Sequence, residues 1–245
     1  MTNRLAAGIA AMFMALVCSP RMFGAIADEL VLNDGVGHVA TIDVSTLGVE
    51  TCAGTCGGLT ILTPGGAHGE IIAIGTLGQF SLDATAEGGG VSTLPTLQNL
   101  NQINATSTGV GMLTSTFTDT SYTDVNPLLN IADSNTTNLG IDTSTIKFTV
   151  LTDGGNAIPA GTSVYTDTLT GASDSNGLGG VDASNPNSPN ASITSMTVMT
   201  FVGKGDIQAN ITVANAVPEP ASIVFLGTMM LGLTALIRNR RLKRS

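Results

Sequence analysis

Short runs in which apolar and polar residues alternate recur along most of the chain. In the segment STIKFTVL, residues 144–151, Ile146, Phe148 and Val150 alternate with polar or more exposed positions, and HVATIDV, residues 38–44, alternates in the same way. Successive side chains of a β-strand point to opposite faces, so this period of two predicts half-buried strands. Similar runs occupy residues 58–63, 70–75, 78–84, 109–118, 162–169, 192–202 and 206–214.

These runs predict an all-β fold, an antiparallel β-sandwich over residues 28–216. They are rich in Thr, Val and Ile, which pack well on a pleated surface, and turn residues such as those of Asp153-Gly154-Gly155 separate them. No sustained helical stripe of apolar residues occurs in this part of the sequence. Two stretches read as long loops: residues 119–142, with one helical turn at 127–131, and residues 171–192, which contain too few apolar groups to pack.

The N-terminus reads as a signal peptide over residues 1–27. Arg4 precedes an apolar helical run from Leu5 to Cys18, and the small residues Ala25 and Ala27 stand at the −3 and −1 positions that signal peptidase requires. We therefore expect cleavage after Ala27. The alternatives are an uncleaved anchor or a buried core helix.

Export of the protein determines which bond we expect Cys52 and Cys56 to form. In an oxidising compartment an even pair of cysteines this close in sequence predicts a disulfide. The competing interpretation is a metal site completed by His68, but a zinc site normally has closer cysteine pairs and four ligands. We predict the disulfide and neither a metal nor a cofactor.

The C-terminal segment, residues 217–245, has three parts in a fixed order. Pro218-Glu219-Pro220 comes first, an apolar stretch follows at residues 221–237, and a basic tail occupies residues 238–245. The prolines exclude both helix and central strand at the tripeptide. The 17 apolar residues can form a short transmembrane helix. The basic residues of the tail keep its end on the cytoplasmic side: Arg238, Arg240, Arg241, Lys243 and Arg244.

This segment resembles the PEP-CTERM sorting signal. The resemblance covers about 28 residues and implies nothing about the fold of the rest of the chain. It implies that an exosortase, an integral-membrane enzyme of exopolysaccharide-producing Gram-negative bacteria, recognises Pro218, Glu219 and Pro220. The chain would first be anchored in the inner membrane and then sorted to the cell surface, where exopolysaccharide is a possible partner.

The charge distribution excludes one class of partner. Residues 28–217 carry 17 acidic residues against only Lys147 and Lys204, a formal balance of 2 − 17 = −15. Such a segment repels phosphate backbones, so nucleic acid is not a predicted partner.

Catalytic motifs are missing from the sequence. No nucleophile elbow, phosphate loop or zinc-protease motif occurs, and the middle of the chain has only His38 and His68. We therefore expect a non-enzymatic protein, structural or adhesive, of the cell surface or extracellular matrix. One alternative is a hydrolase that gathers His38 or His68 with a carboxylate and a serine, although we expect His68 in an exposed loop. The other is a carbohydrate-binding module with exposed rings, for which Tyr122, Tyr165 and the phenylalanines are available.

Overall fold

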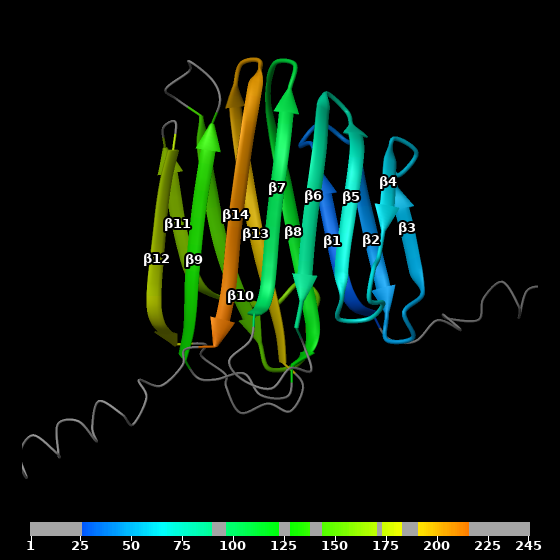
Figure 1. Ribbon diagram of the computed structural model, residues 1–245, viewed down its shortest axis with the longest axis vertical. Helices are drawn as coiled ribbons and strands as arrows, with labels where there is room; N and C mark the ends of the chain where they lie inside the picture. The colour runs from blue at the N-terminus through cyan, green and yellow to red at the C-terminus, as the bar shows by residue number, and fades with distance from the viewer. Residues whose placement is uncertain are drawn as a thin grey trace, which may run out of the picture.

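Within the residues that the structure describes, the protein is an antiparallel sandwich of two seven-stranded sheets. A computed structural model describes residues 26–89, 97–122, 128–137, 144–170, 173–182 and 191–215. All strand pairs in these ranges are antiparallel. The two sheets lie face to face, one in front of the other in the view of Figure 1. The predicted all-β sandwich is confirmed.

The front sheet has the strand order β12-β9-β14-β7-β6-β5-β4 and the back sheet the order β11-β10-β13-β8-β1-β2-β3. The front strands are β4 (Leu59–Leu62), β5 (Glu70–Leu77), β6 (Phe80–Gly88), β7 (Leu97–Ser107), β9 (Leu128–Thr137), β12 (Ser173–Asp182) and β14 (Gly205–Asn215). The back strands are β1 (Ile26–Asn33), β2 (Val39–Ser45), β3 (Glu50–Gly54), β8 (Val110–Tyr122), β10 (Thr145–Asp153), β11 (Thr162–Thr170) and β13 (Ala191–Val202).

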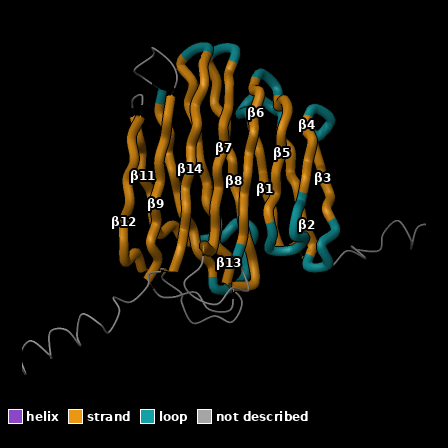
Figure 2. Tube along the Cα trace, in the orientation of Figure 1, coloured by secondary structure: helices purple, strands orange, loops and turns teal. Residues whose placement is uncertain are grey.

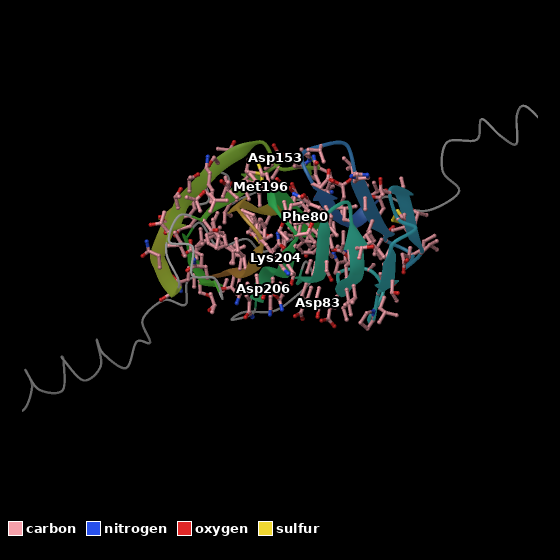
Figure 3. The ribbon with its side chains drawn as sticks, turned by 90° about the horizontal axis from the view of Figure 1, so that it is seen from above. Phe80, Asp83, Asp153, Met196, Lys204 and Asp206 are labelled. Carbon is pink, nitrogen blue, oxygen red and sulfur yellow. A yellow bond between two sulfur atoms is a disulfide. The ribbon has the colours of Figure 1, made fainter. Side chains whose placement is uncertain are left out.

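The core lies between the sheets and is made by the inward half of each alternating run. On β10, Ile146, Phe148 and Val150 are buried while Lys147 is exposed, as the alternation predicts. Figure 3 looks down between the sheets, where the Phe80 ring stacks at an angle on Phe201 with centroids 5.4 Å apart. Burial of these apolar faces is the main term that holds the sheets together.

The described parts of the two stretches expected to be long loops are strands instead. β9 occupies ten residues of the first stretch, including four of the five expected to form a helical turn, and β12 occupies the first half of the second. β12 pairs with β9, and β9 also pairs with β14. These strands are therefore held by hydrogen bonds to neighbouring strands, which the local sequence does not predict. Tertiary pairing overrides weak propensity here. Strands β1, β3 and β7 were likewise not among the predicted runs.

One polar side chain ties the sheets together inside the core. Asn101 of β7 is fully buried and donates its amide hydrogens to the backbone carbonyls of Ser115 on β8 and Ser195 on β13, at 3.2 and 3.1 Å. Its amide oxygen accepts a hydrogen bond from the Ser115 hydroxyl at 2.9 Å. Because each of these contacts crosses from the front to the back sheet, they fix how the sheets are placed on each other.

The chain ends lie outside the described residues. These include Ala25, the tripeptide Pro218-Glu219-Pro220 and the basic tail, so the signal peptide and the transmembrane helix remain predictions. Figure 2 shows the described residues as strands and connecting loops. Among them there is no helix long and apolar enough to cross a membrane. Ala27 is described: it lies buried in β1, next to the predicted cleavage point.

Replacing the buried asparagine tests the inter-sheet tie. Asn101→Ala leaves the carbonyls of Ser115 and Ser195 without this donor, so we expect the free energy of unfolding to fall by about 2 to 4 kcal/mol. The measurement is urea unfolding followed by circular dichroism. Asn104→Ala, on the same strand but exposed, is the matched control and should change stability by less than about 0.5 kcal/mol. Equal effects of the two variants would contradict the tie.

Candidate functional site

Two aspartates face each other inside the sandwich. Asp28 on β1 and Asp119 on β8 are direct partners in the antiparallel ladder. Both side chains point inward and are completely buried. Like charges directly opposite on neighbouring strands repel, and burial removes the water that would screen them. The pair therefore needs a compensating proton or cation.

His68 covers this pair from the turn between β4 and β5. The turn carries Gly65, Gly66 and His68 in left-handed conformations, with a φ of 57° at His68. That conformation is uncommon for a residue with a side chain. It directs the backbone amide of His68 at Asp28, to whose Oδ2 it donates at 2.6 Å. The position of the turn is therefore tied to the buried carboxylates.

The imidazole completes a cluster of three ionisable side chains. The Nδ1 of His68 and the Oδ1 of Asp119 are hydrogen-bonded at 2.8 Å, and an ionised carboxylate can only accept, so the imidazole donates. The same nitrogen lies 3.9 Å from Oδ1 of Asp28. One ligand atom from each residue lies within 4.8 Å of the other two. We call these three residues the Asp28–His68–Asp119 cluster.

The electrostatics of the cluster favour a neutralised Asp28. Burial first, and then the charge of the neighbouring Asp119, raise the pKa of Asp28 to about 9, while the hydrogen bond from the His68 amide lowers it. In the absence of another cation, Asp28 is therefore protonated at neutral pH.

Neighbouring groups pack closely around Asp119. Burial, and after it the charge of Asp119, raise the pKa of the Tyr122 hydroxyl. On the other side the end of β6 passes so close that a Cβ at Gly88 would lie 2.3 Å from Oδ2 of Asp119. The backbone amide of Gly88 donates to the carbonyl of Gly69 at 3.2 Å, which joins β6 to the turn that carries His68. The cluster is thus enclosed by both sheets.

This cluster was not predicted from the sequence, although a signal was present. Asp28 shares its strand face with Leu30 and Leu32, and Asp119 shares its face with Phe117, so each aspartate breaks an apolar face. The expectation that His68 lies in an exposed loop is wrong: its side chain is only 16% exposed because the turn folds onto the sandwich end. His68 contacts two carboxylates and, in its described hydrogen bonds, no serine. That arrangement does not support the hydrolase alternative.

The other histidine has a separate structural role. His38 lies in the β1–β2 turn, and its Nδ1 donates to Oδ2 of Asp34 at 2.5 Å. Burial would raise the pKa of Asp34, but hydrogen bonds from the His38 ring and from the amides of Val36 and His38 hold that pKa below its usual value. This pair closes a turn and does not join the Asp28–His68–Asp119 cluster.

The two described cysteines are joined to each other, and the described aromatic rings are buried. Cys52 and Cys56 form a disulfide at the edge strand β3, so they do not combine with His68 as metal ligands. The exposed rings that would favour a carbohydrate-binding module with stacking platforms are not found in the described part of the chain, where all six Phe and Tyr side chains are buried. The Tyr165 hydroxyl donates to Oδ2 of Asp133 inside the core, and burial, together with Asp133, raises its pKa.

Rows of hydrogen-bonding side chains cover the outer face of the front sheet. One row crosses four strands through Asp83, Asn104, Gln208 and Thr136, each directly opposite the next in the ladder and exposed. A second row, partly exposed, runs parallel to it through Thr85, Gln102, Asn210 and Ser134. We call these eight residues the amide face.

The amide face is polar and weakly acidic. In Figure 3 Asp83 and Asp206 both lie on the side of the front sheet. Amide groups offer donors and acceptors at the same time, whereas carboxylates only accept. The face can therefore hydrogen-bond a ligand rich in hydroxyl groups, but it repels a polyanion.

Comparisons with known proteins give no family. No protein-family description matches the sequence, and no curated protein matches it either. Solved structures with some likeness include carbohydrate-binding modules of the β-sandwich superfamily, at 11% identity over 82% of this chain and 95% of theirs, with a TM-score of 0.33. A family 11 carbohydrate-binding module from Clostridium thermocellum has 12% identity over 80% and 99% of the two chains, with a TM-score of 0.30.

Other similar structures have different functions. The enzymatically active domain of tailspike protein 4 from bacteriophage CBA120 has 12% identity over 55% of this chain and 19% of its own, with a TM-score of 0.28. Likeness at this level carries no argument about the site or the function of this protein. The strand pairing itself establishes the sandwich.

The raised pKa of Asp28 can be tested through the pH dependence of the free energy of unfolding. The pKa of Asp28 is about 9 in the folded protein and about 4 for an unfolded aspartate. Between these values the folded state binds the extra proton, so the free energy of unfolding falls as pH rises from 4 to 9, with a slope of at most about 1.4 kcal/mol per pH unit.

The measurement is urea unfolding at pH 5, 7 and 9 with a chelator present, so that no metal ion contributes. Asp28→Asn is isosteric and does not titrate, so this fall should be absent from the variant. A variant with the same pH dependence as the unmodified protein would show that Asp28 is already ionised at neutral pH.

Proposed function

We propose that this protein is an exported, surface-retained protein whose β-sandwich binds a neutral polysaccharide through the amide face. The observation that carries the proposal is the register that places Asp83, Asn104, Gln208 and Thr136 in one exposed row. The row crosses four adjacent strands, which lie about 4.8 Å apart, so it is long enough to meet several sugar units. The hydrogen-bonded ladder holds the strands that carry these side chains in fixed positions, which lowers the entropy lost on binding.

The binding mode relies on hydrogen bonds in place of ring stacking. The buried rings of the described residues remove the usual apolar platform for a sugar. Asn and Gln side chains can pair with sugar hydroxyls, which also donate and accept. Because each hydrogen bond contributes little net free energy, affinity requires a repeating ligand that engages several of them together. A polysaccharide meets that requirement better than a single sugar.

The charge of the chain restricts the ligand further. The formal balance of residues 28–217 is −15, by the count given above, and the amide face itself carries Asp83. A polymer of sulfated sugars or uronic acids would be repelled. We therefore expect a neutral polymer and no binding to heparin or alginate.

The proposed destination follows from the chain ends. The signal peptide would deliver the sandwich across the inner membrane, and the resemblance of residues 217–245 to the PEP-CTERM signal favours sorting by an exosortase-type enzyme. In that setting polysaccharide binding and surface sorting support the same adhesive role in the matrix. This proposal joins the sequence-based expectation of an adhesive protein to its carbohydrate-binding alternative.

Affinity electrophoresis in gels that contain soluble polysaccharides tests the binding. The probes are mixed-linked β-glucan and β-1,4-galactan as neutral polymers, with alginate as the anionic control. We expect one of the neutral polymers to retard the protein. The double variant Asn104→Ala/Gln208→Ala should bind about 10- to 30-fold more weakly, because each lost hydrogen bond costs about 1 kcal/mol.

The matched control is Thr114→Ala/Thr200→Ala on the outer face of the back sheet, where both positions are only partly buried. Its retardation should equal that of the unmodified protein. Retardation by alginate alone, or equal weakening in the two double variants, would contradict binding by the amide face.

Replacement of Pro218-Glu219-Pro220 by alanines tests the sorting. If an exosortase recognises the tripeptide, the variant should stay at the inner membrane with its tail attached. The unmodified protein recovered from the cell surface should have lost the tail, including Arg240, which intact-mass spectrometry detects. A strain without exosortase should behave like the variant. Normal surface display of the variant would refute recognition of these residues.

A further inference from the structure

One atom of the Asp28–His68–Asp119 cluster lacks a partner. Oδ1 of Asp28 is buried and accepts no hydrogen bond from any described residue, although Oδ2 of the same carboxylate is held by the amide of His68. A buried, unpaired carboxylate oxygen costs free energy, so native structures usually provide it with a donor or an ion. This oxygen lies on the side of the carboxylate that His68 Nδ1 approaches to 3.9 Å.

The three side chains converge as metal ligands do. They offer two carboxylate oxygens and one imidazole nitrogen, all within 4.8 Å of one another. Ligand atoms about 2.1 Å from one ion lie about 3.4 Å apart in tetrahedral coordination. The observed separations of 2.8 and 3.9 Å from His68 Nδ1 lie on either side of that value. Side-chain movements of about 0.5 Å would bring both separations to the value for one ion.

The surroundings hold the ligands in place. Asp28 is fixed by the His68 amide, and Asp119 is enclosed by Tyr122 and by the end of β6 at Gly88. Outer contacts of this kind orient metal ligands and are part of a built site. The carboxylates are fully buried, but the His68 side chain is 16% exposed, which leaves an approach from solvent through the turn.

We propose that the Asp28–His68–Asp119 cluster binds one divalent transition-metal ion, of the Zn²⁺ or Mn²⁺ class. Two buried carboxylates require about two positive charges, which one such ion supplies. The imidazole nitrogen selects against Ca²⁺, which prefers six to eight oxygen ligands, and against Mg²⁺. Water completes the coordination beside three protein ligands.

The proposed role of the ion is structural. It would displace the proton of Asp28 and bond to both carboxylates and to His68. It would thereby join strand β1, strand β8 and the β4–β5 turn at one end of the sandwich. Because the unfolded chain brings these three residues together only rarely, the ion would bind the folded state preferentially and stabilise it.

The test uses the full chain, purified in mild detergent without a histidine tag and stripped with a chelator. After dialysis against Zn²⁺ or Mn²⁺, elemental analysis should find one ion per chain. At about a hundredfold excess of metal over its Kd, the melting temperature should rise by about 5 to 10 °C. Ca²⁺ and Mg²⁺ should give no comparable rise.

Two variants and one control locate the ion. Asp28→Asn and His68→Gln should lose the bound ion and the rise in melting temperature. His38→Gln changes the other histidine, which lies in the β1–β2 turn, and should keep both. Asn at position 28 is uncharged, as the protonated Asp28 is in the chelator, so under those conditions Asp28→Asn should melt close to the unmodified protein, which shows that it folds.

Three results would overturn the proposal. They are no stoichiometric ion in the unmodified protein, an ion retained by both Asp28→Asn and His68→Gln, and tighter binding of Ca²⁺ than of Zn²⁺ and Mn²⁺. The first result would leave a proton on Asp28 as the group that relieves the repulsion between the two aspartates.

Discussion

Burial of one face of each sheet against the other is the interaction on which this structure depends. The chain has no Trp, and its inner faces are lined largely by Ala, Val, Ile and Leu with a few Phe rings. Such side chains bury modest areas, so stability requires many of them. The fourteen strands found among the described residues supply the positions. The extended sheets are therefore a consequence of a sequence that is poor in large apolar residues.

The polar groups inside this core have distinct physical roles. Asn101 finds partners for its amide on the facing sheet and so adds specificity to a core whose apolar contacts have little direction. Asp28 and Asp119 instead oppose each other and leave an oxygen unpaired. Positions that break the local pattern without internal compensation tend to mark functional sites. That contrast separates the structural polar contact from the candidate metal site.

The interior of the sandwich and its amide face have different proposed roles. A buried ion would stiffen one end of the sandwich, while the amide face of the front sheet is open to a ligand. In the proposed extracellular setting, a rigid sheet is useful because it keeps the rows of amide and carboxylate groups in register when a polymer binds. The acidic charge of the sandwich further limits that polymer to a neutral one.

The sequence by itself determined the fold class and the sandwich strands with clear alternation. A period of two is a local property: whether Ile146 and Phe148 share a face depends only on the geometry of one strand. Segment 217–245 likewise carries its sorting expectation in local residue order. Strand β12 could not be predicted, because it is rich in Gly, Ser and Asp and is defined by its pairing with β9. The expected helical turn in β9 failed for the same reason.

Only the tertiary structure decided what the ionisable residues do. Asp28 and Asp119 are 91 positions apart in sequence, and His68 lies between them on a separate turn, so no local spacing relates the three. Strand register brings the aspartates opposite each other, and the left-handed turn at His68 closes the cluster. The amide face has the same origin, since its rows exist only where four strands align. The sequence determines the chemistry of each side chain, but pairing between distant strands determines which other side chains it meets and therefore what it can do.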